Sequence, residues 1–280
     1  MTDQPKTFFI TGVSSGLGRA FAQGALEAGH AVVGTVRNAD AAAEFESLSP
    51  GRAFALQLDM TDFEAMPAAV AEAERLAGPI DVLVNNAGYG HEGVMEESSI
   101  EDLRRQFDVN VFGAVAMMKA VLPGMRERRR GRVINVTSMG GFITMPGISF
   151  YCGSKFALEG ISEALGKEVA AFDVHVTSVA PGQFRTDWAG RSMQRTARSI
   201  SDYDSVMDPL RTARQAKSGN QPGDPTKAAQ ALLRLVDADK PPVRLFLGAD
   251  ALGLVERKLD QMAAEIAAWK DLSLSTSFAA

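Results

Sequence analysis

The chain has 280 residues and a formal net charge of −5 at pH 7, from 29 lysines and arginines against 34 aspartates and glutamates. An acidic balance argues against nucleic acid or an anionic membrane as the main partner. Strand-like and helix-like stretches alternate from Lys6 to Leu247 without a linker or repeat, which predicts one α/β domain over residues 1–280.

A single cysteine, Cys152, permits no internal disulfide and fits a reducing cytoplasm. The short polar start of the chain predicts no signal peptide, and we expect no apolar run long enough to span a membrane. The three histidines have no metal-ligand spacing, so we predict no metal site.

The first predicted strand, Thr7–Ile10, leads into a glycine-rich turn and then a helix that ends at Gly29. This order is the one that a dinucleotide phosphate site requires, because the helix amides and the positive helix dipole favour an anion. A turn that merely connects two elements is the alternative. The cofactor residues predicted here are Gly12, Ser14, Ser15, Gly16, Leu17 and Gly18.

The second strand, Ala31–Val36, is followed by Arg37 where an acid would read a free ribose 2′-hydroxyl. An arginine suits a 2′-phosphate through its charge and its forked donors, which favours NADP(H) over NAD(H). The alternative is a solvated surface arginine, because Asp40 lies only three residues further on.

The next two strands, Phe54–Leu58 and Ile80–Val84, also end in polar or small residues. Asp59 is predicted either to cap the following helix, 63–77, or to bind the adenine edge. The stretch that follows Ile80–Val84 is predicted to form a wall against the cofactor or to stabilise its own turn. Its cofactor residues are Asn86, Ala87 and Gly88.

A long helix is expected from Ile100 to Arg129, and it carries Asn110 in its interior. Asparagine is unfavourable in the middle of a helix, so Asn110 is a candidate for a polar role.

The strongest catalytic candidates are Tyr151 and Lys155, four residues apart and therefore on one face of a helix. An ammonium close to a phenol favours the phenolate, so we expect Lys155 to lower the pKa of Tyr151. Ser138 closes the strand 132–137 and would project at its carboxyl end, where ligands bind in open parallel sheets. Cys152 is expected to be a packed residue and not a nucleophile.

The sixth strand, Val174–Ala180, leads into Pro181, Gly182, Phe184 and Thr186. The segment 184–220 is the least regular part of the chain, and its length predicts a lid or substrate-binding loop. A helix 225–236, a strand 243–247 and a C-terminal helix complete the chain.

Together these motifs resemble the short-chain dehydrogenase/reductase family, in the branch with a Thr-Gly-x-x-x-Gly-x-Gly turn. The overall pattern is similar to members related to 17β-hydroxysteroid and retinol dehydrogenases, which does not establish a steroid or retinoid substrate. The resemblance covers residues 6–247 and implies a Rossmann-type, doubly wound parallel sheet of about seven strands with helices on both faces. It rests on Thr11–Gly18, Asn85–Gly88, Asn110, Ser138, Tyr151, Lys155 and Pro181–Gly182.

The resemblance implies that Tyr151 is the general acid/base and that Lys155 activates it and binds the nicotinamide ribose. Ser138 then orients the substrate oxygen, and Asn110 supports a water relay to Lys155. Residues Pro181, Gly182, Phe184 and Thr186 hold the nicotinamide carboxamide. One departure is that Ser14 and Ser15 stand where many NADP(H)-preferring members carry a second basic residue.

The expected function is NADP(H)-dependent interconversion of a carbonyl, a ketone or an aldehyde, and an alcohol. The alternatives are an NAD-dependent alcohol dehydrogenase of the same family and a non-catalytic cofactor-binding protein. We expect an apolar substrate, with His91 at the rim of the pocket, and a homodimer or homotetramer formed through the Ile100 and Tyr151 helices. The candidate pocket residues are Tyr89, Met139, Phe142, Ile143, Met145, Trp188 and Met193.

Overall fold

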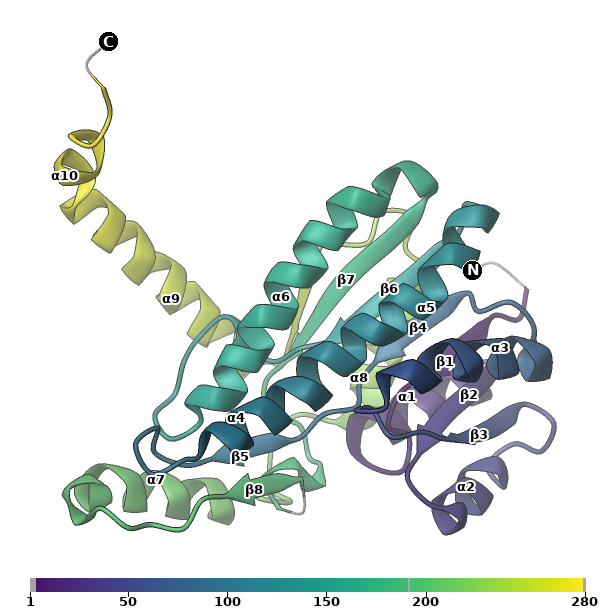
Figure 1. Cartoon of the computed structure of the whole chain (residues 1–280), viewed down its shortest axis with the longest axis horizontal. Helices are drawn as coiled ribbons and strands as arrows, with labels where there is room; N and C mark the ends of the chain where they lie inside the picture. The colour runs from purple at the N-terminus through teal and green to yellow at the C-terminus, as the bar shows by residue number, and fades with distance from the viewer. Residues whose placement is uncertain (1–3, 191, 279–280) are drawn as a thin grey trace.

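The computed structural model describes residues 4–190 and 192–278, and its centre is a seven-stranded, fully parallel sheet (Figure 1). The strand order β3-β2-β1-β4-β6-β7-β9 reverses direction between β1 and β4, which places a ligand crevice at the carboxyl ends of these strands. The predicted fold class is therefore confirmed. The strands are β1 Thr7–Ile10, β2 Ala31–Val36, β3 Ala53–Gln57, β4 Val82–Asn85, β6 Gly131–Val136, β7 Val174–Pro181 and β9 Arg244–Leu247.

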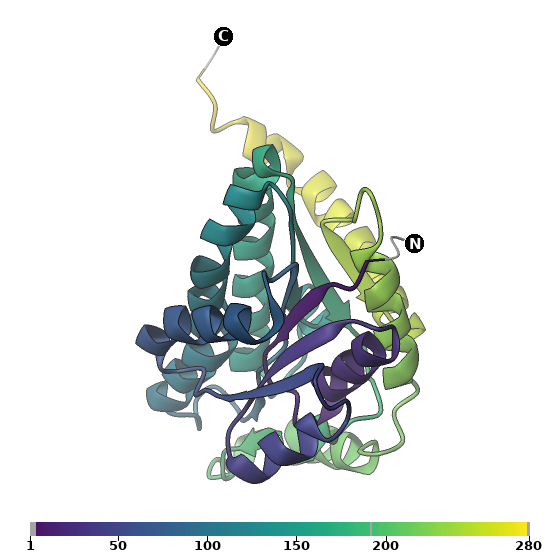
Figure 2. The same cartoon turned by 90° about the vertical axis from the view of Figure 1, so that its right-hand side faces the viewer.

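Helices cover both faces of the sheet (Figure 2). Successive strand residues point to opposite faces, and both sets are apolar, so each face needs a layer of helices to bury it. In β1, Phe8 and Ile10 pack with α1 and α8, whereas Phe9 packs with α3 and α5 on the other face. The covering helices are α1 Gly16–Glu27, α2 Ala39–Glu46, α3 Met66–Ala77, α4 Ile100–Phe107, α5 Gly113–Arg128, α6 Ser149–Val169 and α8 Pro225–Val236.

The predicted helix from Ile100 to Arg129 is interrupted. A π-helical turn, Asp108–Phe112, separates α4 from α5. Such turns insert an extra residue into the helix and are frequent at functional sites. Here the turn accommodates the mid-helix asparagine, Asn110, and buries it at 1% exposure.

One prediction about this helix is wrong. By length and composition alone, the continuous run Ile100–Arg128 is able to cross a membrane. In the structure one face of it packs on the sheet, with Met117, Val121 and Met125 buried in the core. In this fold the run is partly buried, with one face against the sheet.

The segment 184–220 contains more regular structure than the sequence predicts. Strand β8, Met193–Arg195, pairs in parallel with β5, Gly90–Glu92, and helix α7 spans Asp204–Ala216. The buried carboxylate of Glu92 accepts hydrogen bonds from Arg195 (2.8 Å) and Arg214 (2.9 Å). These contacts hold the segment against the body. Arg191, another basic residue of this segment, lies outside the described residues.

The chain ends in helix α9, Ala249–Ala268, and the short helix α10, Lys270–Leu274. The first turns of α9 pack on the body through Ala251 and Val255. Beyond them the helix leaves the body as a projecting arm (Figure 1).

Candidate active site

Ser138 and Tyr151 meet at the carboxyl edge of the sheet. Ser138 follows β6, and its Oγ accepts a hydrogen bond from the amide of Gly140 (3.0 Å), which begins a short helical turn. Tyr151 lies in the first turn of α6. A Cβ placed on Gly140 would be 3.4 Å from both Ser138 Oγ and Tyr151 Cε1, so the two side chains flank this glycine.

Lys155 and Asn110 meet on the inner side of the same site. Lys155 Nζ donates to the carbonyl of Val136 (2.8 Å), and Asn110 Nδ2 donates to Tyr89 O (3.1 Å) and Ser154 Oγ (3.2 Å). A Cβ at Gly88 would lie 3.0 Å from Asn110 Oδ1 and 3.7 Å from Lys155 Nζ. The four predicted catalytic residues are thus brought into one cluster.

Sequence reasoning missed a carboxylate behind this cluster. Glu159 is 4% exposed and accepts hydrogen bonds from Thr137 Oγ1 (2.6 Å) and Arg244 Nε (2.6 Å). Its negative charge opposes the effect of burial on the pKa of Lys155. The signal was present in the sequence, because Glu159 stands four residues after Lys155 on the same helix.

The predicted effect of Lys155 on Tyr151 is wrong for this arrangement. Burial raises the pKa of Tyr151 well above its usual value, and only the hydrogen bond with Ser138 acts in the opposite direction. Lys155 Nζ is 5.8 Å from the centroid of the Tyr151 ring and is bonded to Val136 O. In this geometry Tyr151 is a protonated phenol, which is the form that a general acid requires.

Burial lowers the pKa of Lys155 from 10.5 to about 8. Between these two pH values the unfolded chain holds a proton that the folded protein has released, so this residue makes stability rise with pH. We therefore expect the melting temperature of the wild type to gain on that of Lys155→Met between pH 8 and about 10, above which ordinary tyrosines of the unfolded chain also begin to ionise.

Thermal unfolding of both proteins across this pH range measures the effect. Lys119→Met, at an exposed position on α5, is the matched control and should keep a constant difference from the wild type. A pH-independent difference for Lys155→Met would show that Lys155 is not shifted.

The glycine turn forms a cradle that fits a pyrophosphate. Gly12 and Gly16 have φ of +74° and +60°, a region that favours glycine. A Cβ on Gly18 would lie 2.2 Å from Gly12 O and 2.3 Å from Asn86 Nδ2. Ser15 precedes α1 without a side-chain cap, so the first amides of this helix are available to an anion.

Asn86 stabilises the turn itself. Its Nδ2 donates to the carbonyls of Thr11 (3.0 Å) and Gly12 (3.1 Å), and Thr11 Oγ1 accepts from the amides of Asn86 (2.9 Å) and Ala87 (3.0 Å). These bonds join the ends of β1 and β4 beneath the cradle. Ala87 also closes it, because a Cβ on Gly12 would lie 3.1 Å from Ala87 Cα.

Arg37 and Asp59 lie at the ends of the neighbouring strands β2 and β3. Both are exposed. Two hydrogen bonds from Thr61 hold the pKa of Asp59 below its usual value, and the positive charge of Arg37 makes a smaller contribution in the same direction. Asp59 Oδ1 accepts from Thr61 N (2.9 Å) and Thr61 Oγ1 (2.8 Å), so it caps its own turn, while Asp62 caps the helical turn that follows.

The segment after β7 approaches the cradle from the other side. A Cβ on Gly16 would lie 3.7 Å from Thr186 Cβ. The amide of Gly182 donates to Leu247 O (2.8 Å), and that of Gln183 donates to Asp250 Oδ2 (2.8 Å). Phe184 packs at the edge of the core beside α8. The anchoring role of Asp250, the second residue of α9, had no signal in the sequence.

The predicted pocket residues separate into groups. Trp188 packs against Tyr151, with ring centroids 5.0 Å apart and ring planes tilted by 56°, and Met145 packs in the same cluster. Trp188 and Met193 both lie beside Gly90, whereas Met139, Phe142 and Ile143 pack against the base of α9. Burial raises the pKa of Tyr89 to about 12, and its buried hydroxyl has no hydrogen-bond partner among the residues that the structure describes.

His91 is buried, stacks on Phe150 (5.2 Å) and bonds Thr196 (3.0 Å). Burial lowers its pKa. It therefore belongs to the contact between β5 and the segment 184–220.

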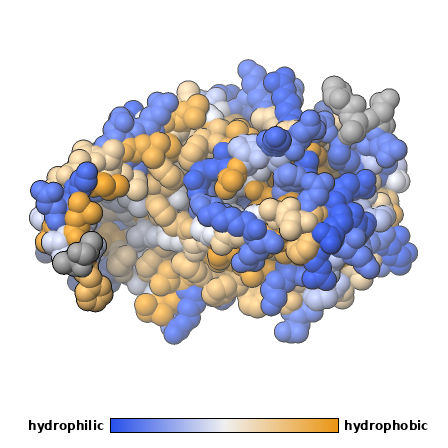
Figure 3. Space-filling model, turned by 90° about the horizontal axis from the view of Figure 1, so that it is seen from above, coloured by the Kyte–Doolittle hydropathy of each residue, from blue (hydrophilic) through white to orange (hydrophobic). Residues whose placement is uncertain are grey.

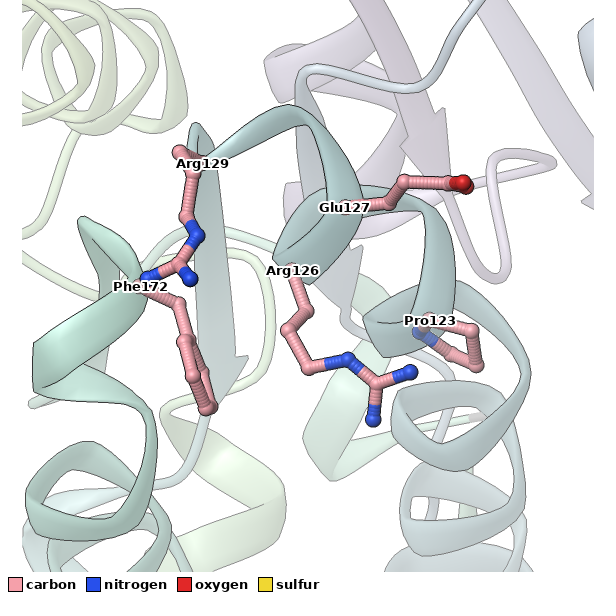
Figure 4. A pocket seen from close by; sticks show the side chains of 5 residues that line it. All are labelled: Pro123, Arg126, Glu127, Arg129 and Phe172. Carbon is pink, nitrogen blue, oxygen red and sulfur yellow. The ribbon is translucent and has the colours of Figure 1, made fainter.

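One surface hollow, of about 500 Å³, is mostly apolar and is lined by Met145 and by Cys152 and Phe156 of α6. Its lining residues lie on another face of α6 from Tyr151 and Lys155. A second hollow, of about 420 Å³, lies between Arg126 and Phe172 at the opposite end of the sheet, where β6 begins (Figure 4).

A glycine cradle at the switch point of a parallel sheet, next to a serine, tyrosine and lysine cluster, defines a nicotinamide-dependent oxidoreductase. Residues 6–197 match the family model of the short chain dehydrogenases. The protein is an enzyme of the short-chain dehydrogenase/reductase family, as the sequence motifs predicted.

Three relatives show the range of proteins to which the chain is similar. A short-chain dehydrogenase from Streptomyces avermitilis has a solved structure with a TM-score of 0.91 and 39% identity, covering 99% of this chain and all of that one. The 3-ketodihydrosphingosine reductase of Bacteroides thetaiotaomicron is 38% identical over 88% of each chain. The NADPH-dependent 3-dehydrocapnine reductase of Ornithobacterium rhinotracheale is 36% identical over 65% of this chain and 67% of that one.

Proposed function

We propose that this enzyme is an NADP(H)-dependent reductase that interconverts an apolar ketone or aldehyde and the corresponding alcohol. The observation that supports this best is the convergence of Ser138, Tyr151, Lys155 and Asn110 beside the glycine cradle. A non-catalytic cofactor-binding protein has no need for this cluster.

In the reductive direction Tyr151 is the proton donor. A nicotinamide cofactor supplies hydride when it is bound. Tyr151 donates its phenolic proton to the carbonyl oxygen, and the Ser138 hydroxyl stabilises the negative charge that develops there. Lys155, held by Val136 O, is the residue that we expect to bind the nicotinamide ribose.

The cofactor preference rests on Arg37. It is exposed at the end of β2, where its guanidinium is free to form a forked contact with a 2′-phosphate. The NADPH dependence of the 3-dehydrocapnine reductase supports the same preference. We expect Arg37→Ala to weaken NADPH binding about tenfold, a loss of about 1.4 kcal/mol, and to leave NADH binding unchanged.

Fluorescence titration of NADPH and NADH against the wild type, Arg37→Ala and Arg126→Ala measures this effect. Arg126 lies at the opposite end of the sheet, and its variant should bind both cofactors like the wild type. Equal binding of NADPH and NADH by the wild type would contradict the proposal and favour the NAD-dependent alternative.

An apolar substrate is supported by the side chains of Trp188 and Met145, which pack with Tyr151. Long-chain ketones are the first candidates, with 3-ketodihydrosphingosine at the head of the panel because a relative is named for its reduction. NADPH consumption with each ketone is the test. Turnover of polar ketones alone would contradict the proposal.

For assembly we propose a homodimer or homotetramer in the cytoplasm, with neither nucleic acid nor a membrane as partner. Ile100, Phe112 and Phe156 are exposed on α4, the π-helical turn and α6, which supports association through these helices. The acidic net charge supports the proposal that neither nucleic acid nor a membrane is a partner. The single, buried cysteine supports a location in the cytoplasm.

A further inference from the structure

The C-terminal arm carries an apolar stripe that nothing covers in the described chain. From Leu259 to Phe278 every residue is exposed, including Ile266 (68%) and Trp269 (64%). An isolated helical segment of this length is marginal in water, because helices need packing of an apolar face to be stable. The arm therefore needs a partner.

The spacing of the stripe is typical of helix pairing. Its apolar residues recur at alternating steps of three and four, the pattern of positions a and d in a heptad. Val255 is buried against the body, and the remainder is exposed. The stripe consists of Leu252, Val255, Leu259, Met262, Ile266 and Trp269.

The charges of the arm favour a protein partner over a lipid surface. Residues 249–278 contain five acidic and three basic side chains. Helices that lie on membranes are instead rich in lysine and arginine on their polar face. Figure 3 shows apolar residues on the arm and on the body next to it, so a partner helix would meet apolar surface along its length.

We propose that the arm pairs with the arm of a second copy of this chain in an antiparallel, two-fold arrangement. Paired helices lie about 8–10 Å apart, so parallel arms would force the two bodies, each much wider than a helix, against one another at one end. The arm leaves the body at one of its ends only (Figure 1), so the antiparallel order would place the two bodies at opposite ends of the pair.

One antiparallel register pairs the four outer residues of the stripe. It sets Leu259 opposite Trp269 of the second copy and Met262 opposite Ile266 of the second copy. It also sets Glu256 opposite Lys270 of the second copy, a favourable pair of charges beside the seam. Two-fold symmetry makes each of these contacts twice. This surface is separate from the faces of α4 and α6.

Sedimentation velocity of the full-length protein tests the contact. Ile266→Glu places a charge in the seam and should halve the mass of the wild-type assembly. Ala264→Glu introduces the same charge on the opposite side of α9 and should leave the mass unchanged. A monomeric wild type, or an Ile266→Glu variant with the wild-type mass, overturns the proposal.

Cross-linking tests the register without disrupting it. Ala263 flanks the seam and faces its own counterpart in the antiparallel pair, whereas Ala264 points away. Ala263→Cys should therefore form a covalent dimer with a short bis-maleimide, and Ala264→Cys should not. The native thiol of Cys152 should not interfere, because it is only 2% exposed. Equal cross-linking at both positions, or at neither, overturns the antiparallel pairing. Sedimentation of the wild type with phosphatidylcholine vesicles would point to a membrane as the occupant instead.

Discussion

Tyr151→Phe should lower kcat by about 10²–10⁴-fold, which is the range that a positioned general acid contributes. The substitution removes one hydroxyl and keeps the ring, which packs against Trp188 and fills the buried position at the start of α6. The affinity for NADPH should therefore stay close to that of the wild type. Steady-state kinetics and fluorescence titration measure the two effects separately.

Tyr203→Phe is the matched control for this substitution. The Tyr203 hydroxyl donates to Glu96 (2.7 Å) at the surface and is not part of the catalytic cluster. Its loss should leave kcat unchanged. Turnover by Tyr151→Phe at the wild-type rate would remove Tyr151 from the mechanism, even though the fold and the family would stand.

Gly18→Ala should lower both stability and cofactor affinity. Its Cβ would lie 2.2 Å from Gly12 O and 2.3 Å from Asn86 Nδ2, so the turn must shift or the helix must move away. Overpacking of this kind costs about 1–3 kcal/mol. Because the atoms that must shift form the phosphate cradle, we expect the Kd for NADPH to rise at least about tenfold, or 1.4 kcal/mol.

Gly160→Ala provides the comparison for this helical glycine. A Cβ at Gly160 meets nothing within 4 Å, and alanine is the better helix former by about 1 kcal/mol. This variant should be as stable as the wild type or more so, with unchanged cofactor affinity. Chemical denaturation and NADPH titration of the two variants compare them directly. Equal behaviour would mean that the cradle tolerates a side chain.

The elements of the sheet could be predicted because their signals are local. Apolar runs such as Thr7–Ile10 and Ala31–Val36 are bounded by glycine or polar residues, and their order along the chain predicts a parallel sheet. The helix 225–236 has the predicted bounds because Asp224 caps it and Pro225 begins it.

The features that the sequence did not predict depend on contacts between residues that are distant in the chain. The π-helical turn at Asn110 is stabilised by Tyr89 and Ser154, and the pairing of β5 with β8 joins segments about a hundred residues apart. The pKa of Tyr151 follows from how deeply the fold buries the phenol, a property that the spacing of Tyr151 and Lys155 does not contain.

The bond between Gln183 and Asp250 has a consequence for the order in which the enzyme becomes competent during synthesis. The residues of the glycine cradle, with Asn86 and Ala87 beneath it, belong to the first 87 positions, whereas the carboxylate that anchors the segment after β7 belongs to position 250 of 280. A nascent chain emerges from its N-terminus, so the residues of the cradle are synthesised long before the anchor of the opposite wall. A product that ends before position 250 lacks the anchor of the nicotinamide side, and full competence waits for the last tenth of translation.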